Sequence, residues 1–440
     1  MISALDIAYT SFVAASAPYW LIAPKARRKV LTALRQRMGH VASRDLSRPA
    51  VMIHAVSLGE MNATRALVTE LRQARPDLQF ILSTTTDTGF KRGQELYGND
   101  RDITLIRYPL DFTSAIERVL KSLRPDVVVL MELELWPNFL RLCRRRRIPV
   151  ILVNGRLTPY SFRRYRLIKP IARWMFRGVA SVCAQDEIYA KRFIDLGADP
   201  ATVQVTGTMK FDTAHVADRI EGDDQLAEEV GLKTGEPLWV CGSTGPGEEK
   251  TCLDIYRNLQ ENFPTLRLAI IPRKPERFDE VAALITACGF ALTRRSQPDK
   301  RKENAVILGD TMGELRKFYS LATIVFVGRT IVDLGPRQHG SDMIEPAALA
   351  KAVIIGPYTA NFADVMTRLK QSNAIIEVQD ATELQSSLYK MLAATEEIAA
   401  VGRRAQQVVV EQQGATRRHA KIILSNLASP GPFPRVPREH

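Results

Sequence analysis

The sequence contains few cysteines and none of the spacings that usually signal a metal site. Its five cysteines are scattered along 440 residues without a CxxC pair, and its six histidines form no HExxH pattern. An odd, unpatterned set of cysteines indicates a reducing compartment and argues against zinc. We therefore expect no metal site and no bound cofactor.

The common glycine-rich nucleotide motifs are also absent. GxGxxG does not occur, which argues against a dinucleotide enzyme. The turn GSTGPGEE at 242–249 resembles a phosphate loop only superficially. The Walker pattern needs GxxxxGK[ST], whereas Glu248 follows Gly247 here. We therefore reject nucleotide hydrolysis.

Acidic residues are too few to balance the basic ones. The chain has 61 Lys and Arg against 48 Asp and Glu, a formal net charge of +13. Such a balance suits nucleic acid, anionic lipid, or phosphorylated and carboxylated substrates. The chain has no recognisable nucleic-acid-binding fold or aromatic–basic motif, so we predict no nucleic acid partner.

The N-terminal stretch 2–23 is largely apolar and is followed by KARRK at 25–29. A signal peptide would carry its positive charge before the apolar run. The length just suffices to cross a bilayer, and Tyr19 and Trp20 beside a basic cluster are typical of an interfacial anchor. We predict an N-terminal membrane-anchor helix within 1–30, with the rest of the chain in the cytoplasm. A helix docked on the protein body remains the alternative.

From residue 50 onward, short apolar runs alternate with helical stretches, first over 50–210 and again over 238–378. Near-continuous apolar strands between helices predict parallel sheets covered on both faces. The fold class is therefore α/β, with two Rossmann-like, doubly wound domains around a central cleft. The predicted boundaries are 31–215 for an acceptor-side domain, 216–236 for a linker, 237–428 for a nucleotide-sugar domain with a C-terminal helix, and 429–440 for a disordered tail.

Ligands of such folds bind at the carboxyl ends of the strands, so residues that directly follow strands are the site candidates. In the first half these are Glu60 in HAVSLGE, Glu132 and Glu134 in MELELWPN, and Lys210 in TGTMKFD. Glu60 is a candidate general base. Ser57-x-x-Glu60 also fits a capping box, and the two other glutamates could form a structural pair with nearby basic segments. These alternatives stay open from the residues alone.

In the second half, Arg273 follows a strand, GDTMGEL at 309–315 opens a helix whose amides suit a phosphate, and Glu345 near a helix start suits ribose hydroxyls. Thr311-x-x-Glu314 could again be only a capping box. The residues thus predict a two-domain enzyme that binds a nucleotide sugar in its second domain and an acceptor near Glu60.

At these positions the chain resembles the 3-deoxy-D-manno-octulosonic acid (Kdo) transferases of lipopolysaccharide synthesis. The resemblance covers nearly the whole chain and rests on HAVSLGE, STTTDTG, YPLDF, MELELWPN, NGRLTPYSFRRY, AQDE, TGTMKFD, IPRKPERF, GDTMGEL and GPYTANF. It implies a GT-B fold and an inverting transfer of Kdo from CMP-Kdo to a lipid A precursor, lipid IVA. It also implies action at the cytoplasmic face of the bacterial inner membrane, with membrane lipid as a partner.

The resemblance also implies roles for individual residues. Glu60 corresponds to the general base, and Glu132 and Lys210 to groups that stabilise the transition state. The segments that match CMP-binding positions comprise Pro272, Arg273, Met312, Gly313, Glu314, Asp342, Met343, Ile344 and Glu345. The family commonly reads Gly-Gly-His-Asn-Pro-Leu-Glu where this chain has HGSDMIE at 339–345. We expect Glu345 to bind the ribose, and Asp342 to point away from the CMP phosphate or to pair with Arg337 or Arg329.

Two other classes of function fit the same residues. One is a different membrane-associated GT-B transferase or epimerase that acts on a sugar nucleotide. The other is an inactive, membrane-tethered carbohydrate-binding protein, against which intact Glu60, Glu132 and Lys210 argue. The basic runs RRRR at 144–147 and RRYRLIK at 163–169 are candidates for contact with phosphorylated acceptor and anionic lipid, or are a solvated face.

Overall fold

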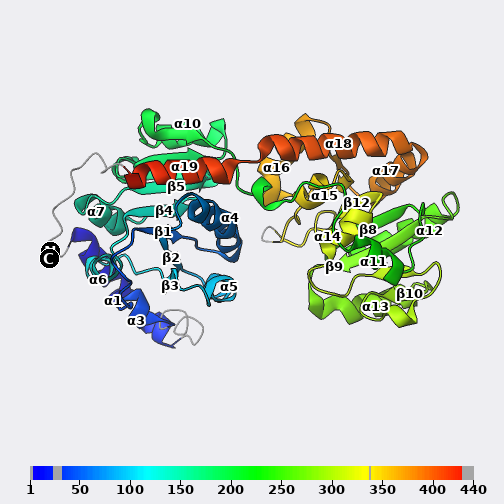
Figure 1. The fold of residues 1–440 in the computed structure, drawn as a ribbon, viewed down its shortest axis with the longest axis horizontal. Coiled ribbons are helices and arrows are strands. Elements are labelled where there is room, and N and C mark those ends of the chain that lie inside the picture. The colour runs from blue at the N-terminus through cyan, green and yellow to red at the C-terminus, as the bar shows by residue number, and fades with distance from the viewer. Residues whose placement is uncertain (1–2, 23–31, 336–337, 429–440) are drawn as a thin grey trace. The chain divides into compact units, whose positions relative to one another are not determined.

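A computed structural model describes residues 3–22, 32–335 and 338–428, which form two compact α/β units (Figure 1). The first unit, here the first domain, contains the described residues up to Thr213 and those from Gln413 onward. The second domain runs from Ala214 to Gln412. The prediction of two α/β domains with parallel sheets is confirmed.

The described part of the first domain contains a seven-stranded sheet in the order β3-β2-β1-β4-β5-β6-β7, and every pairing is parallel. The strands are β1 (Ala50–His54), β2 (Gln79–Thr84), β3 (Ile103–Arg107), β4 (Val127–Met131), β5 (Val150–Gly155), β6 (Ser181–Ala184) and β7 (Val203–Val205). The helices between them are α4 (Leu58–Ala74), α5 (Asp87–Tyr97), α6 (Thr113–Leu123), α7 (Pro137–Arg145), α8 (Pro159–Leu167), α9 (Lys169–Phe176) and α10 (Glu187–Asp195). The central strands β1, β4 and β5 are buried along their whole length, as their unbroken apolar sequences predict.

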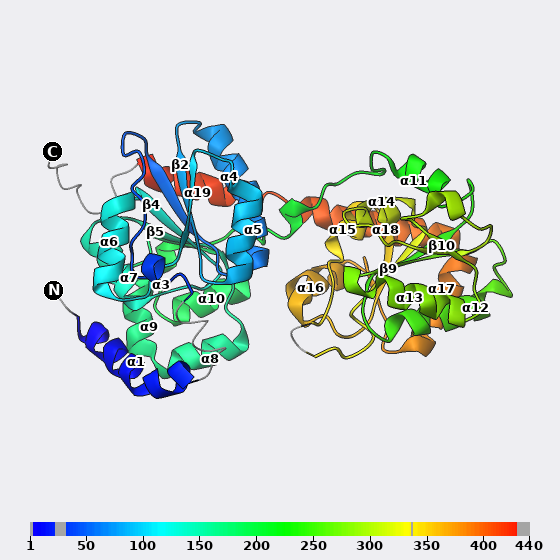
Figure 2. The same ribbon diagram turned by 90° about the horizontal axis from the view of Figure 1, so that it is seen from below.

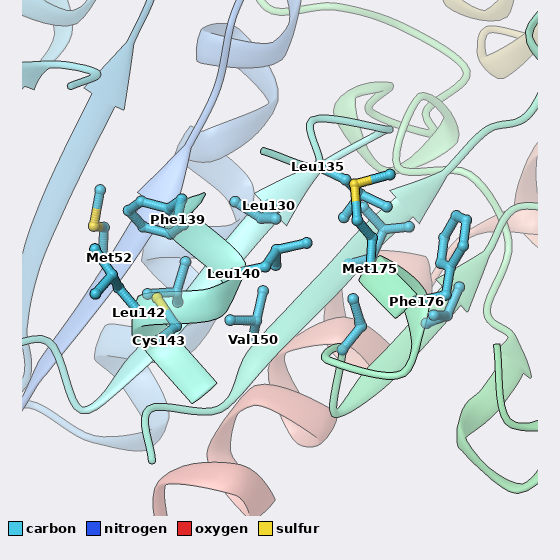
Figure 3. Close-up of a cluster of buried hydrophobic side chains, with 14 of the residues drawn as sticks. Met52, Leu130, Leu135, Phe139, Leu140, Leu142, Cys143, Val150, Met175 and Phe176 are labelled. Atoms are coloured by element: carbon cyan, nitrogen blue, oxygen red, sulfur yellow. The ribbon is translucent and has the colours of Figure 1, made fainter. Parts of the chain in front are cut away.

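The core of this domain lies on both faces of the sheet. Figure 3 shows one face, where Leu130 and Val150 from the strands meet Phe139 of α7 and Met175 and Phe176 of α9. All of these side chains are almost fully buried. Burying a side chain of this size contributes about 1.5–3 kcal/mol, so this packing fixes α7 and α9 against the sheet.

The second domain repeats the design with a seven-stranded parallel sheet in the order β10-β11-β9-β8-β12-β13-β14 among the described residues. Its strands are β8 (Leu238–Thr244), β9 (Arg267–Pro272), β10 (Leu292–Arg294), β11 (Val306–Leu308), β12 (Ile324–Val327), β13 (Ala352–Ile355) and β14 (Ile376–Glu377). The helices that flank them include α12 (Glu248–Gln260), α13 (Phe278–Ala287), α14 (Leu315–Leu321), α15 (Ile344–Ala348), α16 (Ala363–Gln371), α17 (Ala381–Ala393) and α18 (Thr395–Gln412). The sequence pattern missed β10, a three-residue edge strand with too few apolar residues to stand out.

The predicted boundary of the second domain at 428 is wrong, because the last helix belongs to the first domain. Helix α19 (Ala415–Ala428) buries Ala420, Ile423 and Leu427 in the same cluster as β4 and β5 of the first sheet. Figure 1 shows α19 lying along that sheet. The helix has an apolar stripe that either domain could have covered, so the sequence pattern alone did not assign it.

The predicted linker at 216–236 is also corrected. These residues contain α11 (Asp223–Glu229) and pack within the second domain. The buried Asp223 pairs with Arg219 at 2.7 Å and accepts a hydrogen bond from the Ser320 hydroxyl. The acidic stretch that suggested an inter-domain connection therefore supplies a buried carboxylate, which pairs with the exposed side chain of Arg219.

The N-terminal helix α1 (Ala4–Ile22) is docked through its first turns. Asp6 accepts hydrogen bonds from the Thr113 backbone N–H at 2.8 Å and from the Asn138 side chain at 3.2 Å, and the Tyr9 hydroxyl donates to Asp111 at 3.1 Å. Among the described residues, no helix has the length and apolarity needed to cross a membrane. The structure thus favours the docked alternative for this part of the predicted anchor. Residues 23–31 and the predicted tail 429–440 lie outside the described residues.

Candidate active site

Glu60 lies where β1 ends and α4 begins, and the capping box predicted there is present in an extended form. The Ser57 hydroxyl accepts the Glu60 backbone N–H at 3.3 Å and donates to Glu60 Oε1 at 2.8 Å. Glu60 Oε2 accepts the Val56 backbone N–H at 2.9 Å. In the usual box the glutamate returns to the N-cap residue, whereas here it reaches one residue further back. Both oxygens are therefore held in place.

Glu60 can do more than cap its helix, because its surroundings change the pKa of its carboxyl group. Burial, with a further contribution from the neighbouring charge of Glu132, raises the pKa of Glu60 to about 7. Hydrogen bonds from Val56 and Ser57 oppose the rise without cancelling it. A carboxylate whose pKa lies near the working pH is well matched to accept a proton. The structure therefore brings Glu60 and Glu132 together, as predicted.

Glu132 follows β4 in a backbone conformation that non-glycine residues rarely adopt. Its φ is +57°, and its N–H donates to the Val153 carbonyl of the adjacent strand at 3.0 Å. Strained backbone of this kind clusters at functional sites. Glu134 accepts a hydrogen bond from the Trp136 indole at 3.2 Å, and burial raises the pKa of its carboxyl.

Lys210 lies in the loop that follows the edge strand β7. A hydrogen bond from this loop to Asn154 of β5 joins it to the middle of the sheet. The Asn154 side chain accepts the Met209 backbone N–H at 3.2 Å, and Asn154 itself is the penultimate residue of β5, with a φ of +53°. β5 is the neighbour of β4, the strand that ends at Glu132. The structure thus places Lys210 on the same sheet edge as the two glutamates.

The C-terminal helix supports this edge of the sheet, a role that the sequence did not indicate. His419 of α19 is fully buried, and its Nε2 lies 2.8 Å from the Thr206 hydroxyl and 3.5 Å from the Asn154 backbone nitrogen. Burial lowers the pKa of His419 to about 3, so the ring is neutral at physiological pH. A neutral ring nitrogen can accept from these groups.

His54, the first residue of HAVSLGE, is the last residue of β1. Its ring is fully buried and stacks on Tyr108 at 3.8 Å between ring centroids, and its Nδ1 lies 3.1 Å from the Ser83 carbonyl. Burial lowers the pKa of His54 to about 3. This histidine is therefore neutral and supports the end of β1, and we assign it no proton-transfer role.

In the second domain, the predicted donor segments meet around Glu345. Burial, together with the adjacent Asp342, raises the pKa of Glu345 to about 7, and Arg316 and Arg273 oppose that rise. Arg273 directly follows β9, where Pro272 ends the strand, and Arg316 lies in α14. Three segments that are far apart in the chain thus supply one cluster of charges.

Of the other residues predicted to bind the donor, some are exposed to solvent and others are already paired with side chains of the protein. Met312 is 71% exposed, and Gly313 has a φ of +86° with open space where a Cβ would lie. The Glu314 carboxylate is held by Arg295 at 3.0 Å and by the Thr311 hydroxyl. Although burial alone would raise it, these partners hold the pKa of Glu314 below its ordinary value. The Glu314 carboxylate is therefore already paired within the protein, and the exposed turn before it could also offer its backbone to a ligand.

Asp342 Oδ1 accepts the Ile344 backbone N–H at 2.8 Å, so this oxygen caps the start of α15. Whether Asp342 also pairs with Arg337 or Arg329 stays a prediction. Met343 and Ile344 are buried and position the helix start by packing. Arg337 lies outside the described residues.

Glu248 is the residue of this domain that the sequence interpretation undervalued. Its buried carboxylate accepts four backbone N–H groups, from Gly245 at 2.8 Å, Arg329 at 2.6 Å, Thr330 at 2.8 Å and Ile331 at 3.1 Å. A carboxylate of the protein therefore occupies these four amides. The only sequence signal was a glutamate at a helix start after a glycine-rich turn.

The described residues contain no group of three or more His, Cys, Asp or Glu that could hold a metal ion. The side chains described above offer a different chemistry at the carboxyl edge of each sheet. In the first domain it is proton acceptance by a carboxyl with a raised pKa. In the second it is binding of a polar, anionic ligand by arginines, backbone amides and Glu345.

Two Rossmann-like domains with such edges form a fold that glycosyltransferases of the two-domain type share with sugar-nucleotide epimerases. A glycosyltransferase from Rickettsia africae has a similar fold, with a TM-score of 0.57 and 15% identity over 87% of this chain and 100% of that one. A UDP-GlcNAc 2-epimerase from Neisseria meningitidis has a TM-score of 0.55 and 14% identity over 86% of this chain and 99% of that one. The fold alone therefore does not separate transfer from epimerisation.

Sequence comparison narrows this class. The profile of the family described as 3-deoxy-D-manno-octulosonic-acid transferase (kdotransferase) matches residues 32–213. A 3-deoxy-D-manno-octulosonic acid transferase from Haemophilus influenzae is 32% identical over 89% of this chain and 90% of its own length. The chain belongs to the Kdo transferase family, and it is a Kdo transferase in the general sense of that name.

Proposed function

We propose that this protein transfers Kdo from CMP-Kdo to the lipid A precursor lipid IVA at the cytoplasmic face of the bacterial inner membrane, with inversion at the sugar. The observation that carries the catalytic part is the position of Glu60, which is fixed by hydrogen bonds through both oxygens and has a pKa raised to about 7. Family membership supports Kdo as the transferred sugar.

In the proposed reaction, Glu60 takes the proton of the acceptor hydroxyl as its oxygen attacks the anomeric carbon of Kdo. The bond from that carbon to the CMP phosphate oxygen breaks, and CMP leaves with the bonding electrons. Lys210 stabilises the negative charge of the sugar carboxylate and of the departing phosphate, and Glu132 contributes to stabilising the transition state. No bound cofactor and no metal enter this sequence of steps.

The second domain supplies the donor half of the site in this proposal. Arg273 and Arg316 attract the anionic CMP, and the turn at Met312 and Gly313 offers backbone amides to its phosphate. Glu345 accepts hydrogen bonds from the ribose hydroxyls, for which a carboxylate is a strong paired acceptor. Asp342 stays turned toward its own helix start.

One mass-spectrometric experiment tests the proposed reaction. Purified protein is incubated with CMP-Kdo and lipid IVA, with and without a metal chelator, and the molecular mass of the lipid product is measured. A product heavier by one or more Kdo units, equally abundant with chelator, is the expected result. Transfer from a UDP-linked sugar instead, or conversion of a sugar nucleotide without any acceptor, would favour the alternative GT-B transferase or epimerase.

A further inference from the structure

Trp136 is a large aromatic residue that is partly exposed beside the glutamates of the first domain. It lies in the connection between β4 and α7, at the carboxyl edge of the sheet, and is 37% exposed. Glu132 and Glu134 precede it in the same connection. Single exposed apolar side chains are common, so exposure alone assigns no role to this one. Its fixed orientation and its neighbours are more informative.

Neighbouring groups fix the orientation of the indole. Its N–H donates to Glu134 Oε2 at 3.2 Å, and its ring centroid lies 6.5 Å from that of Tyr108. Pro137 follows it and restricts the backbone of Trp136 to extended conformations, in agreement with its φ of −110° and ψ of 121°. The indole is therefore held in place while part of it faces solvent. A side chain that is already ordered loses little conformational entropy when a ligand binds to it.

The helix that begins directly after Trp136 is anchored to the domain core. Asp111 accepts the backbone N–H groups of Asn138 at 3.0 Å and of Phe139 at 2.9 Å, and Phe139 is fully buried. Figure 2 shows α7 beside α6, the helix that begins shortly after Asp111. Trp136 is thus attached to a fixed helix start.

The connection that contains Trp136 also supplies charges that act on Glu60. Burial, the charge of Glu132 and, to a smaller degree, the charge of Glu134 raise the pKa of Glu60 to about 7. Glu134, which accepts the indole N–H, therefore lies within electrostatic reach of the proposed base. The strands that lead to Glu60 and to Trp136, β1 and β4, are neighbours in the sheet. Leu58, the first residue of α4, is 47% exposed and adds a second apolar side chain to this edge.

We propose that Trp136 is a platform for the acceptor, on which a pyranose ring of the acceptor sugar stacks so that its reacting hydroxyl lies near Glu60. A pyranose ring has a face of C–H groups that packs on an aromatic ring, while its hydroxyl groups point outward to polar partners. Trp136 supplies the aromatic ring, and Glu134 supplies a polar partner beside it. An acyl chain could also cover the indole, but it would remove water from the neighbouring carboxyl groups without offering them a hydrogen bond.

This inference rests on the proposed sugar acceptor and identifies a residue that positions it. A stacked ring has a fixed plane, so its hydroxyl groups can point toward Glu60 in only a few directions. Restricting the approach of a nucleophile in this way lowers the entropy cost of reaching the transition state. The identity of the residue at position 136 should therefore affect how well the acceptor binds.

Calorimetric titration of the full chain without donor tests the platform. The probe is the phosphorylated disaccharide that remains when the acyl chains of lipid IVA are removed. Trp136→Leu keeps an apolar side chain near Tyr108 but has no flat face, whereas Trp136→Phe keeps an aromatic ring. We expect the affinity to fall about tenfold in Trp136→Leu and less than about threefold in Trp136→Phe. The matched control is Tyr389→Leu, which removes a 46% exposed ring in the second domain and should leave the affinity unchanged.

The same titration with intact lipid IVA in detergent separates the sugar from the acyl chains. An equal loss of affinity for both ligands in Trp136→Leu is the expected result. A loss confined to lipid IVA would overturn the inference, because the indole would then contact an acyl chain. Equal losses in Trp136→Phe and Trp136→Leu would overturn it too, since the indole N–H rather than the ring would be responsible. So would a wild type that does not bind the disaccharide.

Failure of the platform is distinguishable from failure of the proposed reaction, because the titrations contain no donor. A wild type that binds the disaccharide through Trp136 but transfers no Kdo would refute the proposed reaction and support the platform. A wild type that transfers Kdo while Trp136→Leu binds the disaccharide normally would refute the platform and support the reaction.

Discussion

Replacing Glu60 by glutamine separates its capping role from its role as a base. Glutamine keeps one carbonyl oxygen, which can accept either the Val56 N–H or the Ser57 hydroxyl, so α4 still begins at the same residue. The amide cannot take a proton from the acceptor. Loss of a general base reduces turnover by about 10²- to 10⁴-fold, and we expect kcat to fall at least ~100-fold while donor KM changes little.

Because the pKa of Glu60 is raised, the same substitution should lower activity but should not lower the stability of the fold. A carboxyl whose pKa rises from 4.5 to about 7 on folding has its charged form disfavoured by about 3 kcal/mol. The folded protein binds this proton more tightly than the unfolded chain, so stability is present at low pH and lost as pH rises from about 4.5 to 7. Glu60→Gln should therefore unfold at a temperature equal to or above that of the wild type at pH 8. At pH 5 it should have no such advantage.

The assay combines Kdo transfer measured from pH 5.5 to 9 with thermal unfolding at pH 5 and pH 8. Wild-type kcat/KM should rise with pH to a plateau above about 7, and that limb should disappear in Glu60→Gln. Glu70→Gln on the same helix is the matched control and should change neither property. Near-normal turnover in Glu60→Gln, or inactivity accompanied by a large loss of stability at pH 8, would refute the assignment of Glu60 as base.

Four further substitutions test the donor half and the domain assignment. Glu248→Ala leaves four buried N–H groups without an acceptor and should lower the free energy of unfolding by at least about 3 kcal/mol, measured by denaturant titration. Glu345→Ala should raise donor KM by the equivalent of about 1.5–3 kcal/mol with little change in kcat, because a bond made equally in ground and transition states is lost. Asp342→Asn should bind CMP within a factor of about ten of wild type, since asparagine can still accept the Ile344 N–H. Ile423→Ala should cost about 2–5 kcal/mol and should increase hydrogen exchange in the first sheet.

Each of these expectations has a contrary result. A stable Glu248→Ala protein would mean that water or a relaxed loop replaces the carboxylate. If Glu345→Ala binds CMP like the wild type while Asp342→Asn binds it more weakly, the ribose contact belongs to Asp342 rather than to Glu345. Faster exchange in the second sheet after Ile423→Ala would mean that α19 stabilises the other domain.

The sequence predicted the secondary structure well where burial is continuous along a strand. The near-continuous apolar runs of β1, β4, β5, β8, β9 and β12 are buried along their whole length, so the sequence pattern was enough to predict these strands. The short edge strand β10 has only one buried residue and left no such pattern. The amphipathic α19 has a clear apolar face, but a periodic stripe does not say which of two similar domains covers it.

By itself, the sequence determined two parallel α/β domains and the residues at the carboxyl ends of their strands, because both follow from local pattern and from the geometry of βα units. Only the tertiary structure decided what those residues can do. The pKa of Glu60 depends on Glu132, which is distant in the chain, and Asn154 beside the Lys210 loop is supported by His419, 265 residues further on. Burial, charge proximity and hydrogen-bond geometry are properties of distances in space, and no spacing along the chain encodes them directly.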